Sequence, residues 1–326
     1  MPDATALPRP PFDPEFVPFL DALAARGPFR LTPEVLPRMR ALEVTEAQLD
    51  EGLRARGLER RSVTVPGHLG DPIALAVVQR VGRTGTAACA YAIHGGGMVA
   101  GHHLGNLGSY DEWLLTHDVV LVSPDYRLAP EHPDPYPVED CYAGLTWTAE
   151  HADELGVDPA RLLLVGQSAG GGLAAGTALL ARDRRGPAVL GQVLVSPMLD
   201  DRDDTVSTRQ FDGVGVADRG ATRSGWDAYL GDRRGGDDVS PSAAPGRATD
   251  LAGLPPAYVD CGSAEVFRDE AVAYASALWA AGVQAELHVC PGAFHGSATM
   301  QPDATLSRRA VTALREWTGR RLASAG

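Results

Sequence analysis

Lysine is missing from this chain of 326 residues, so arginine carries all of its positive side-chain charge. Acidic residues outnumber basic ones by 42 to 29, which gives a formal net charge of −13. Nucleic acids and anionic membranes both require basic surface, so we expect neither as a partner. The missing lysine also excludes a Walker phosphate loop, whose Gly-Lys step precedes a Ser or Thr.

Long apolar runs are absent as well, and none approaches the length that spans a bilayer. The first 16 residues lack the charged and apolar segments of a secretory signal, so we expect a cytoplasmic location. Cysteine is scarce and lacks metal-ligand spacing, and we predict no metal and no cofactor. We expect all four to be reduced, buried thiols: Cys89, Cys141, Cys261 and Cys290. Cys261 and Cys290 end two predicted strands that could be neighbours, so a bridge between them is the alternative.

Short apolar runs alternate with helical patterns from residue 59 onward. An antiparallel pair is predicted first, at 61–66 and 73–80. The later strands are predicted at 87–93, 119–123, 162–165, 189–196, 257–261 and 285–290, and the helices at 138–151, 168–182, 269–281 and 303–322. This alternation indicates an α/β fold with a mainly parallel sheet covered on both faces.

Two segments fall outside the alternation. The first 58 residues contain short helical patterns broken by prolines, at 14–25, 32–42 and 45–56. Residues 200–250 are rich in Asp, Arg and Gly, with one helical fragment at 224–230. A structureless loop of that size is unusual inside a compact domain, so we interpret it as a lid or cap inserted between residues 59–199 and 251–326 of the main domain.

The motif Gly166-Gln167-Ser168-Ala169-Gly170 follows an apolar run and opens an Ala- and Leu-rich helix. Strand, tight turn and helix form the context in which G-x-S-x-G acts as a nucleophile elbow. The flanking glycines leave no Cβ to clash, and the helix N-terminus favours negative charge. We predict that Ser168 attacks an ester-type carbonyl; the alternative is an ordinary glycine-rich helix start.

His94-Gly95-Gly96-Gly97 follows the strand at 87–93. Glycines allow close approach and expose backbone N–H groups, which could stabilise an oxyanion together with the N–H of Ala169. The alternative is dinucleotide binding, because Gly95, Gly97 and Ala100 formally fit G-x-G-x-x-A. The residues that follow lack the apolar periodicity of the helix that such a motif opens.

The histidine of such a triad follows the serine and the acid in chain order, and only His288 and His295 lie beyond Ser168. His288 falls inside a predicted strand. His295 lies in a loop after the last strand, where its imidazole can reach over the sheet edge. We predict His295 as the general base.

Four carboxylates follow the strand at 257–261 and could complete the triad. Asp269 and Glu270 fit the first turn of a helix, where acids satisfy the helix dipole. Glu265 lies in the loop beyond the strand, and we favour it as the residue that orients the imidazole. Asp260, near the strand end, remains the alternative.

These motifs together resemble the hormone-sensitive-lipase-like family of carboxylesterases. The resemblance runs from about Tyr91 to the C-terminus and rests on five segments: His94–Gly97, Asp125–Pro133, Gly166–Gly170, Arg268–Glu270 and Phe294–Gly296. It implies an α/β-hydrolase fold in which residues 1–58 join the insertion at 200–250 to form a helical cap. It also implies oxyanion donors at Gly96, Gly97 and Ala169, a buried ion pair for Arg127, and the possibility of a homodimer.

The chain departs from the family pattern at three places. Gln167 replaces the usual Asp or Thr, Met98 stands where an aromatic residue often follows the glycines, and Glu265 replaces Asp. Gln167 and Met98 are therefore candidate substrate-pocket residues. Trp226 and Tyr229, three residues apart on the helical fragment, either face the substrate or only pack the cap.

The sequence therefore predicts a serine carboxylesterase that hydrolyses small acyl esters or lactones through an acyl-enzyme. One alternative keeps the same triad in a dedicated natural-product lactonase, thioesterase or cyclase. The other is a non-catalytic ligand-binding receptor on a hydrolase scaffold. The related plant hormone receptors lack the catalytic histidine, whereas His295 is present here.

Overall fold

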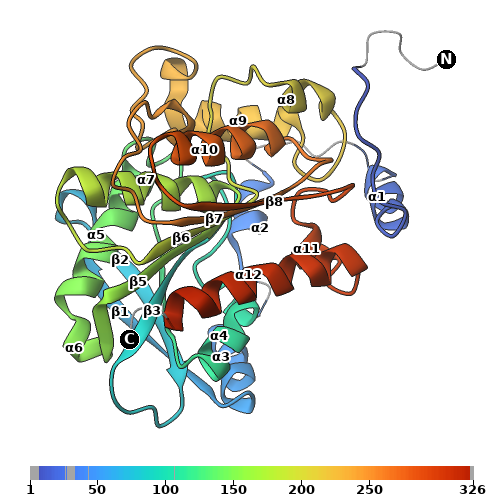
Figure 1. Ribbon diagram of the computed structural model, residues 1–326. Helices are drawn as coiled ribbons and strands as arrows, with labels where there is room; N and C mark the ends of the chain where they lie inside the picture. Colours follow the sequence, from blue (N-terminus) through green and yellow to red (C-terminus); the bar gives the residue numbers. More distant parts are fainter. Residues whose placement is uncertain (1–6, 26, 28–33, 43, 106, 324–326) are drawn as a thin grey trace.

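A twisted sheet of eight strands forms the centre of the computed structural model, which describes residues 7–25, 27, 34–42, 44–105 and 107–323 (Figure 1). The strand order is β1-β2-β4-β3-β5-β6-β7-β8. β1 and β2 are antiparallel, β2 joins β4 antiparallel, and the remaining pairs are parallel. The bounds are Leu58–Pro66, Pro72–Arg80, Ala87–Ile93, Val120–Pro124, Val157–Gln167, Gly191–Val195, Ala257–Gly262 and Ala285–Cys290 for β1 to β8. The predicted α/β fold is confirmed.

Helices cover both faces of the sheet (Figure 1). One face carries α5 (Tyr136–Glu150), α7 (Ala169–Asp183) and α10 (Arg268–Ala280), and the other carries α3 (Glu46–Ala55), α4 (Asp111–Thr116) and α12 (Thr305–Ala323). Side chains of β3 alternate between the two cores, with Tyr91 in the first and Ala90 in the second. Burial on both faces explains why the central strands are continuous apolar runs.

Most predicted bounds agree with the structure within a few residues, and the strands at 87–93 and 285–290 agree fully. β5 begins at Val157, earlier than predicted. The apolar pattern does not reveal this first part of the strand, because its residues are mostly polar and partly exposed. The helix predicted at 14–25 is α1 (Val17–Ala24). That predicted at 32–42 is the shorter α2 (Leu36–Arg40), and residues 32 and 33 lie outside the described residues.

The four cysteines are all free, and three are buried as predicted. Cys290 is only half-buried, because β8 is the edge strand of the sheet. The strands ending in Cys261 and Cys290 are neighbours, with Gly262 paired to Cys290. Among the described helices, none is long and apolar enough to cross a membrane.

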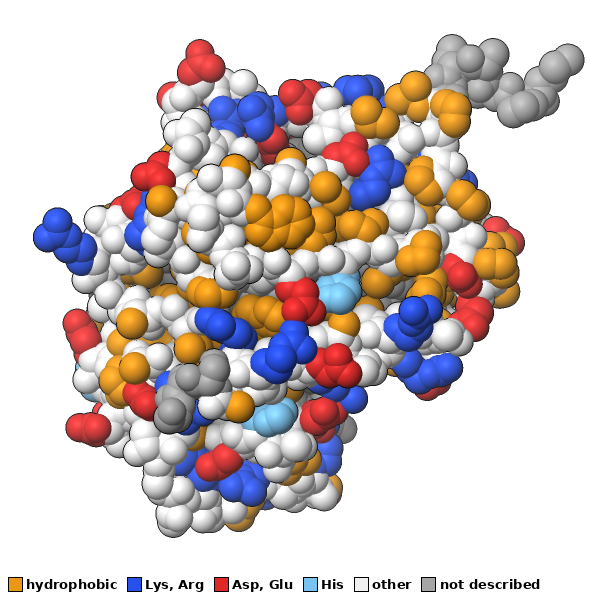
Figure 2. Space-filling view, viewed as in Figure 1, with side chains coloured by type: hydrophobic (Ala, Val, Ile, Leu, Met, Phe, Trp, Pro, Cys, Tyr) orange, Lys and Arg blue, Asp and Glu red, His pale blue; other side chains and the backbone are white. Residues whose placement is uncertain are grey.

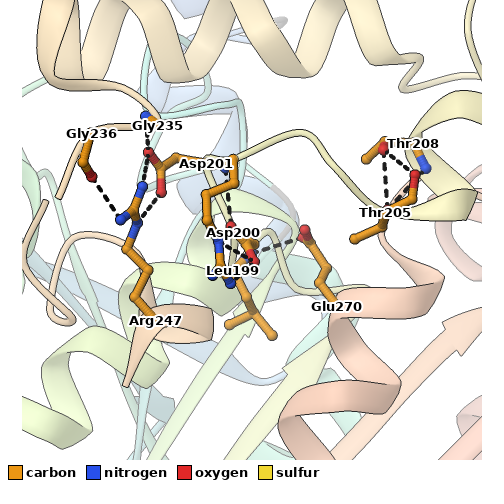
Figure 3. Close-up of polar contacts among 10 residues, drawn as sticks. Leu199, Asp200, Asp201, Thr205, Thr208, Gly235, Gly236, Arg247 and Glu270 are labelled. Carbon is orange, nitrogen blue, oxygen red and sulfur yellow. Dashed lines mark hydrogen bonds and ion pairs between the residues drawn. The ribbon is translucent and has the colours of Figure 1, made fainter. Parts of the chain in front are cut away.

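The segment 200–250 holds two helices, α8 (Val206–Gln210) and α9 (Arg219–Leu230), and its two ends are tied together (Figure 3). The fully buried Asp201 carboxylate accepts from Arg247 Nε at 2.5 Å and Nη2 at 2.9 Å. It also accepts from the backbone N–H of Gly235. Beside it, Leu199 N–H donates to Glu270 on α10 at 2.9 Å, which anchors the start of the segment to the helix layer on this face of the sheet.

A second buried ion pair holds the segment between β4 and α5. Asp140 on α5 is completely buried and accepts from the Nε, Nη2 and backbone N–H of Arg127, and from the N–H of His68. Arg127 Nη1 also donates to Asp71 at 2.7 Å. Four donors around one carboxylate compensate its desolvation, and they connect the turn before β2 to the helix layer.

We expect Asp140→Ala to lower the free energy of unfolding by about 3–5 kcal/mol, because it leaves the Arg127 guanidinium poorly paired beside the core. Urea unfolding followed by circular dichroism measures the change. Glu154→Ala is the matched control, since its pair with Arg61 is exposed on both sides and separated by 3.6 Å. That variant should change stability by less than about 1 kcal/mol. Equal effects of the two substitutions would contradict the assignment.

Candidate active site

The turn between β5 and α7 holds Ser168 in a strained backbone conformation. Its φ of +59° and ψ of −127° lie outside the regions that non-glycine residues normally occupy. A Cβ at Gly166 would lie 2.0 Å from the carbonyl oxygen of Gly170, and a Cβ at Gly170 would lie 2.1 Å from that of Ile93. Only glycine fits at either position. The serine is half-buried at the N-terminus of a 15-residue helix, in the strand–turn–helix setting that the motif predicts.

The glycine loop, residues 94–97, packs directly against this turn. A Cβ at Gly95 would lie 2.8 Å from the carbonyl oxygen of Gln167 and 3.4 Å from the Cβ of Ser168. Gly96 and Gly97 have φ of +122° and +64°, which places them in the region that glycine favours. Among the described residues we find no backbone acceptor for their N–H groups. The N–H of Ala169 belongs to the first turn of α7, where helices lack internal acceptors.

The loop does not continue as a dinucleotide-binding motif would. Residues 101 and 102 are irregular, residues 103–105 form a turn, and the next described helical element is the short 3₁₀ helix η2 (Leu107–Tyr110). A dinucleotide motif opens a long helix at this point instead. The loop is held from the N-terminal segment: Arg40 of α2 donates to the carbonyl oxygens of Val99 and Ala129.

His295 lies in the loop between β8 and the short helix α11 (Ser297–Met300), and it is 8% exposed. Its Nδ1 is 3.3 Å from Oε2 of Glu265, whose side chain is fully buried. The pair has ion-pair distance without the alignment of a hydrogen bond, as is common in catalytic pairs before substrate binds. The ring of Phe267 packs edge-on against the imidazole, 5.0 Å between centroids. A carboxylate at Nδ1 leaves Nε2 free to act as the base.

Asp260, the alternative acid, faces a different partner. It lies near the end of β7, is 7% exposed, and its Oδ2 accepts from the hydroxyl of Tyr258 at 3.3 Å. Burial raises the pKa of Asp260 to about 7, and the nearby charge of Glu265 adds to the rise. Asp269 and Glu270 instead serve the base of the 200–250 segment, where they accept from the backbone N–H groups of Ser207 and Leu199. Glu265 is therefore the acid that contacts the imidazole.

The histidine loop also reaches the residue before Ser168. Thr299 Oγ1 donates to Gln167 Oε1 at 3.4 Å, and a Cβ at Gly296 would lie 3.7 Å from Gln167 Nε2. A Cβ at Gly262, at the end of β7, would lie 2.0 Å from the carbonyl oxygen of Ala293. The structure thus gathers the predicted serine, glycine loop, histidine and acid at the carboxyl ends of β3, β5, β7 and β8.

The N-terminal arm, residues 12–20, supports the histidine loop, a contact that no motif in the sequence predicts. Asp13 N–H donates to the carbonyl oxygen of Gly292 at 3.0 Å. The ring of Phe294 packs against Phe16 at 5.1 Å and Phe19 at 5.5 Å between centroids. The spacing of Phe16 and Phe19 indicates that this arm is buried, but nothing near them in the sequence indicates that Phe294 is their partner.

The remaining predicted pocket residues differ in exposure. Trp226 and Tyr229 on α9 are 1% and 0% exposed within the main core, which favours the packing alternative. Met98 is also buried, at 2%. Gln167 is half-buried and lines cavities. No cluster of three or more potential metal ligands is found among the described side chains.

Comparison with known proteins agrees with the fold described above. Residues 90–299 match a family described as having the α/β-hydrolase fold. The esterase LipI of Mycobacterium tuberculosis is 33% identical over 339 aligned positions, which cover 96% of this chain and 97% of that protein.

Two solved structures show the same likeness. A bacterial heroin esterase superposes with a TM-score of 0.83 at 37% identity, over 95% of this chain and 98% of that one. The esterase LipW of Mycobacterium marinum gives 0.81 at 34% identity, over 97% and 98%. The chain therefore belongs to the α/β-hydrolase family, in its hormone-sensitive-lipase-like branch of esterases.

Proposed function

We propose that this protein is a serine carboxylesterase that hydrolyses small acyl esters or lactones, with Ser168, Glu265 and His295 as its triad. The observation that carries the proposal is the placement of a strained serine beside a buried carboxylate–imidazole pair and a glycine loop whose Gly96 and Gly97 amides have no backbone acceptor in the described part of the chain. The esterase activity named for its relatives supports the same reaction.

The first half-reaction forms an acyl-enzyme. Ser168 Oγ attacks the carbonyl carbon while His295 Nε2 takes the hydroxyl proton, and Glu265 stabilises the imidazolium that results. The carbonyl oxygen becomes an oxyanion, and the N–H groups of Gly96, Gly97 and Ala169 supply its hydrogen bonds. One such donor is commonly worth about 2.7–4 kcal/mol in the transition state. The bond to the alcohol oxygen then breaks, and His295 gives its proton to the departing alcohol.

The second half-reaction frees the serine. His295 takes a proton from water, whose oxygen attacks the acyl carbon bound to Ser168. The second tetrahedral intermediate collapses, the proton returns to Ser168 Oγ, and the carboxylic acid leaves. The net reaction adds one water across the ester bond and needs no cofactor.

The N-terminal arm and the segment 200–250 together would form the cap over this site. The arm contacts the histidine loop through Phe294, and Arg40 of α2 donates to the carbonyl oxygen of Val99, just beyond the glycine loop. On α9, a Cβ at Gly225 would lie 2.9 Å from the carbonyl oxygen of Gly97, so this helix rests on the same loop. Both segments therefore contact loops that border Ser168. These contacts support the prediction that residues 1–58 and 200–250 form the cap.

Two alternatives are weaker. A dedicated lactonase, thioesterase or cyclase would use the same triad, but the relatives are named as esterases. A non-catalytic receptor has no need of an imidazole held against a buried carboxylate, which His295 and Glu265 provide. The cytoplasmic location stays a prediction.

A homodimer through β8 is a further part of the proposal. β8 is an edge strand whose six residues are all at least partly exposed, and Val289 on it is 39% exposed. Figure 2 shows hydrophobic side chains on this face over α10 and β8, where Trp279 is 48% exposed. An open edge with apolar neighbours pairs readily with a second strand.

Light scattering after gel filtration should give about twice the chain mass of 34.3 kDa. Val289→Arg should reduce the measured mass to that of one chain.

We expect Ser168→Ala to lower kcat for p-nitrophenyl butyrate by roughly a millionfold, because no other group would form the acyl-enzyme. Release of p-nitrophenol measures the rate. Ser276→Ala is the control, since this exposed hydroxyl on α10 only donates to the carbonyl oxygen of Val272. Turnover of short esters that survives Ser168→Ala would rule out the proposed nucleophile.

We expect Glu265→Gln to lower kcat by roughly 1,000- to 10,000-fold, because a neutral amide no longer stabilises the imidazolium. Asp260→Asn should change kcat by less than about tenfold, since Asp260 bonds to Tyr258 instead of the imidazole. Steady-state rates for both variants decide between them. A larger loss in Asp260→Asn would transfer the role of the acid to that residue.

Asp260→Asn should also change how the free energy of unfolding depends on pH. This measurement tests whether Asp260 is buried as described. The pKa of Asp260 is about 7 in the fold against 3.8 ordinarily, so the folded chain holds this proton more tightly than the unfolded chain. Its ionisation therefore removes stability as the pH rises from about 4 to about 7. The free energy of unfolding of the native protein, measured in urea, should fall over that range relative to the variant's.

A further inference from the structure

Arg40, on the short helix α2 of the N-terminal segment, bonds to the chain just beyond the glycine loop. Its Nε donates to the carbonyl oxygen of Val99 at 2.8 Å, and its Nη2 donates to that of Ala129 at 2.9 Å. Two further bonds, from Nη1 at 2.9 Å and from Nη2 at 2.8 Å, reach the Glu131 carboxylate. Hydrogen bonding to Arg40 lowers the pKa of Glu131 to about 2, so this carboxylate is charged near neutral pH and orients the guanidinium.

The two carbonyl oxygens depend on Arg40 for a donor. Val99 is 3% exposed and Ala129 is fully buried. In the described part of the chain we find no other donor to either oxygen. A buried carbonyl oxygen without a donor costs free energy. Removal of the guanidinium therefore favours a rearranged loop in which water reaches these atoms.

A displacement of Val99 is transmitted to the glycines. Ala100 follows Val99, and a Cβ at Gly96 would lie 2.1 Å from the carbonyl oxygen of Ala100. The N–H groups of Val99 and Ala100 both donate to the carbonyl oxygen of Gly96, at 3.2 Å and 2.9 Å. Residues 96–100 therefore form one tight turn, in which the backbone of Gly96 cannot stay in place when Val99 moves.

The two ends of the glycine loop are held differently. At one end, steric contacts described above set Gly95 against the nucleophile turn and Gly97 against α9. At the other end, the N–H of Gly101 donates to the carbonyl oxygen of Met39 on α2 at 3.2 Å. Two neighbouring residues of α2, Met39 and Arg40, thus hold this second end by hydrogen bonds.

We propose that Arg40 is a positioning residue for the oxyanion hole. Through Val99 it fixes where the amides of Gly96 and Gly97 lie relative to the serine, and it touches no reacting atom itself. The proposal rests on the esterase function proposed above, and it gives the N-terminal segment a part in the reaction beyond covering the site. Loss of this contact lowers the rate of the chemical step and leaves ester binding in place, because the oxyanion forms only after the ester has bound.

The first test measures hydrolysis of p-nitrophenyl butyrate by Arg40→Ala, with rates referred to the folded fraction. We expect kcat to fall roughly 10- to 100-fold, since a misplacement of about 1 Å can cost a hundredfold, and KM to change by less than about threefold. Arg40→Lys keeps a positive charge beside Glu131 but lacks the planar fork, so it should show a smaller loss in the same direction. Arg38→Ala is the matched control, since this arginine is exposed on the same helix.

A trifluoromethyl ketone separates positioning from a loss of stability. Ser168 Oγ adds to its carbonyl carbon, the hydroxyl proton passes to His295, and the carbonyl oxygen becomes an oxyanion that the loop amides bind. Its Ki should rise by about the same factor as kcat/KM falls, because both report binding of the oxyanion. A variant that is merely less stable keeps the native Ki in its folded fraction. Native values of kcat and Ki in Arg40→Lys and in folded Arg40→Ala would overturn the proposal.

Amide hydrogen exchange tests the positioning without any substrate. The N–H groups of Ala100 and Gly101 are bonded to Gly96 and Met39. Their exchange should be roughly tenfold faster in Arg40→Ala than in the native protein, and unchanged in Arg38→Ala. Equal exchange in all three proteins would also contradict the proposal. If exchange rises as expected but the native protein hydrolyses no ester, the positioning by Arg40 stands and the esterase function fails.

Discussion

The site depends on direct backbone contact between the nucleophile turn and the glycine loop. At Gly170 and Gly95 there is no room for a Cβ against the carbonyl oxygens of Ile93 and Gln167. Two backbone segments in van der Waals contact can neither approach further nor separate without losing that contact. The amides of the glycine loop are therefore held at a fixed distance from Ser168. The strained φ of Ser168 persists because β5 is paired on both sides, with β3 and β6, and these pairings fix the chain up to the turn.

Electrostatics in the neighbouring strand ends depend on two buried carboxyl groups. Asp260 and Glu265 are both nearly inaccessible, and the charge of Glu265 raises the cost of charge on Asp260. Burial and the nearby charge of Glu265 raise the pKa of Asp260 to about 7, so a large fraction of it is protonated near neutral pH. A neutral Asp260 lets Glu265 carry the negative charge that faces His295. The fold thereby assigns one anion to the imidazole from a pair of acids that the sequence presents together.

Much of the site was predictable because its signals are local. Gly166 to Gly170 lie on consecutive residues whose strand and helix flank them directly, and His295 follows the last strand in a Pro- and Gly-containing loop. Contacts between distant segments were not predictable from one sequence. Nothing near Asp140 indicates that it is fully buried under Arg127. The spacing of Trp226 and Tyr229 places both on one face of a helix, but it does not say whether that face meets ligand or core.

The contact of the N-terminal arm with the histidine loop joins the two ends of the chain. Glu15 accepts from the backbone and hydroxyl of Thr305, 290 residues later, and Phe16 packs on the residue before His295. The arm leaves the ribosome before β8 and its following loop, and it can dock only after both have been synthesised. The packing around the imidazole is therefore completed late in the synthesis and folding of the chain. A chain interrupted before residue 292 has its serine and glycine loop but nothing for the arm to hold.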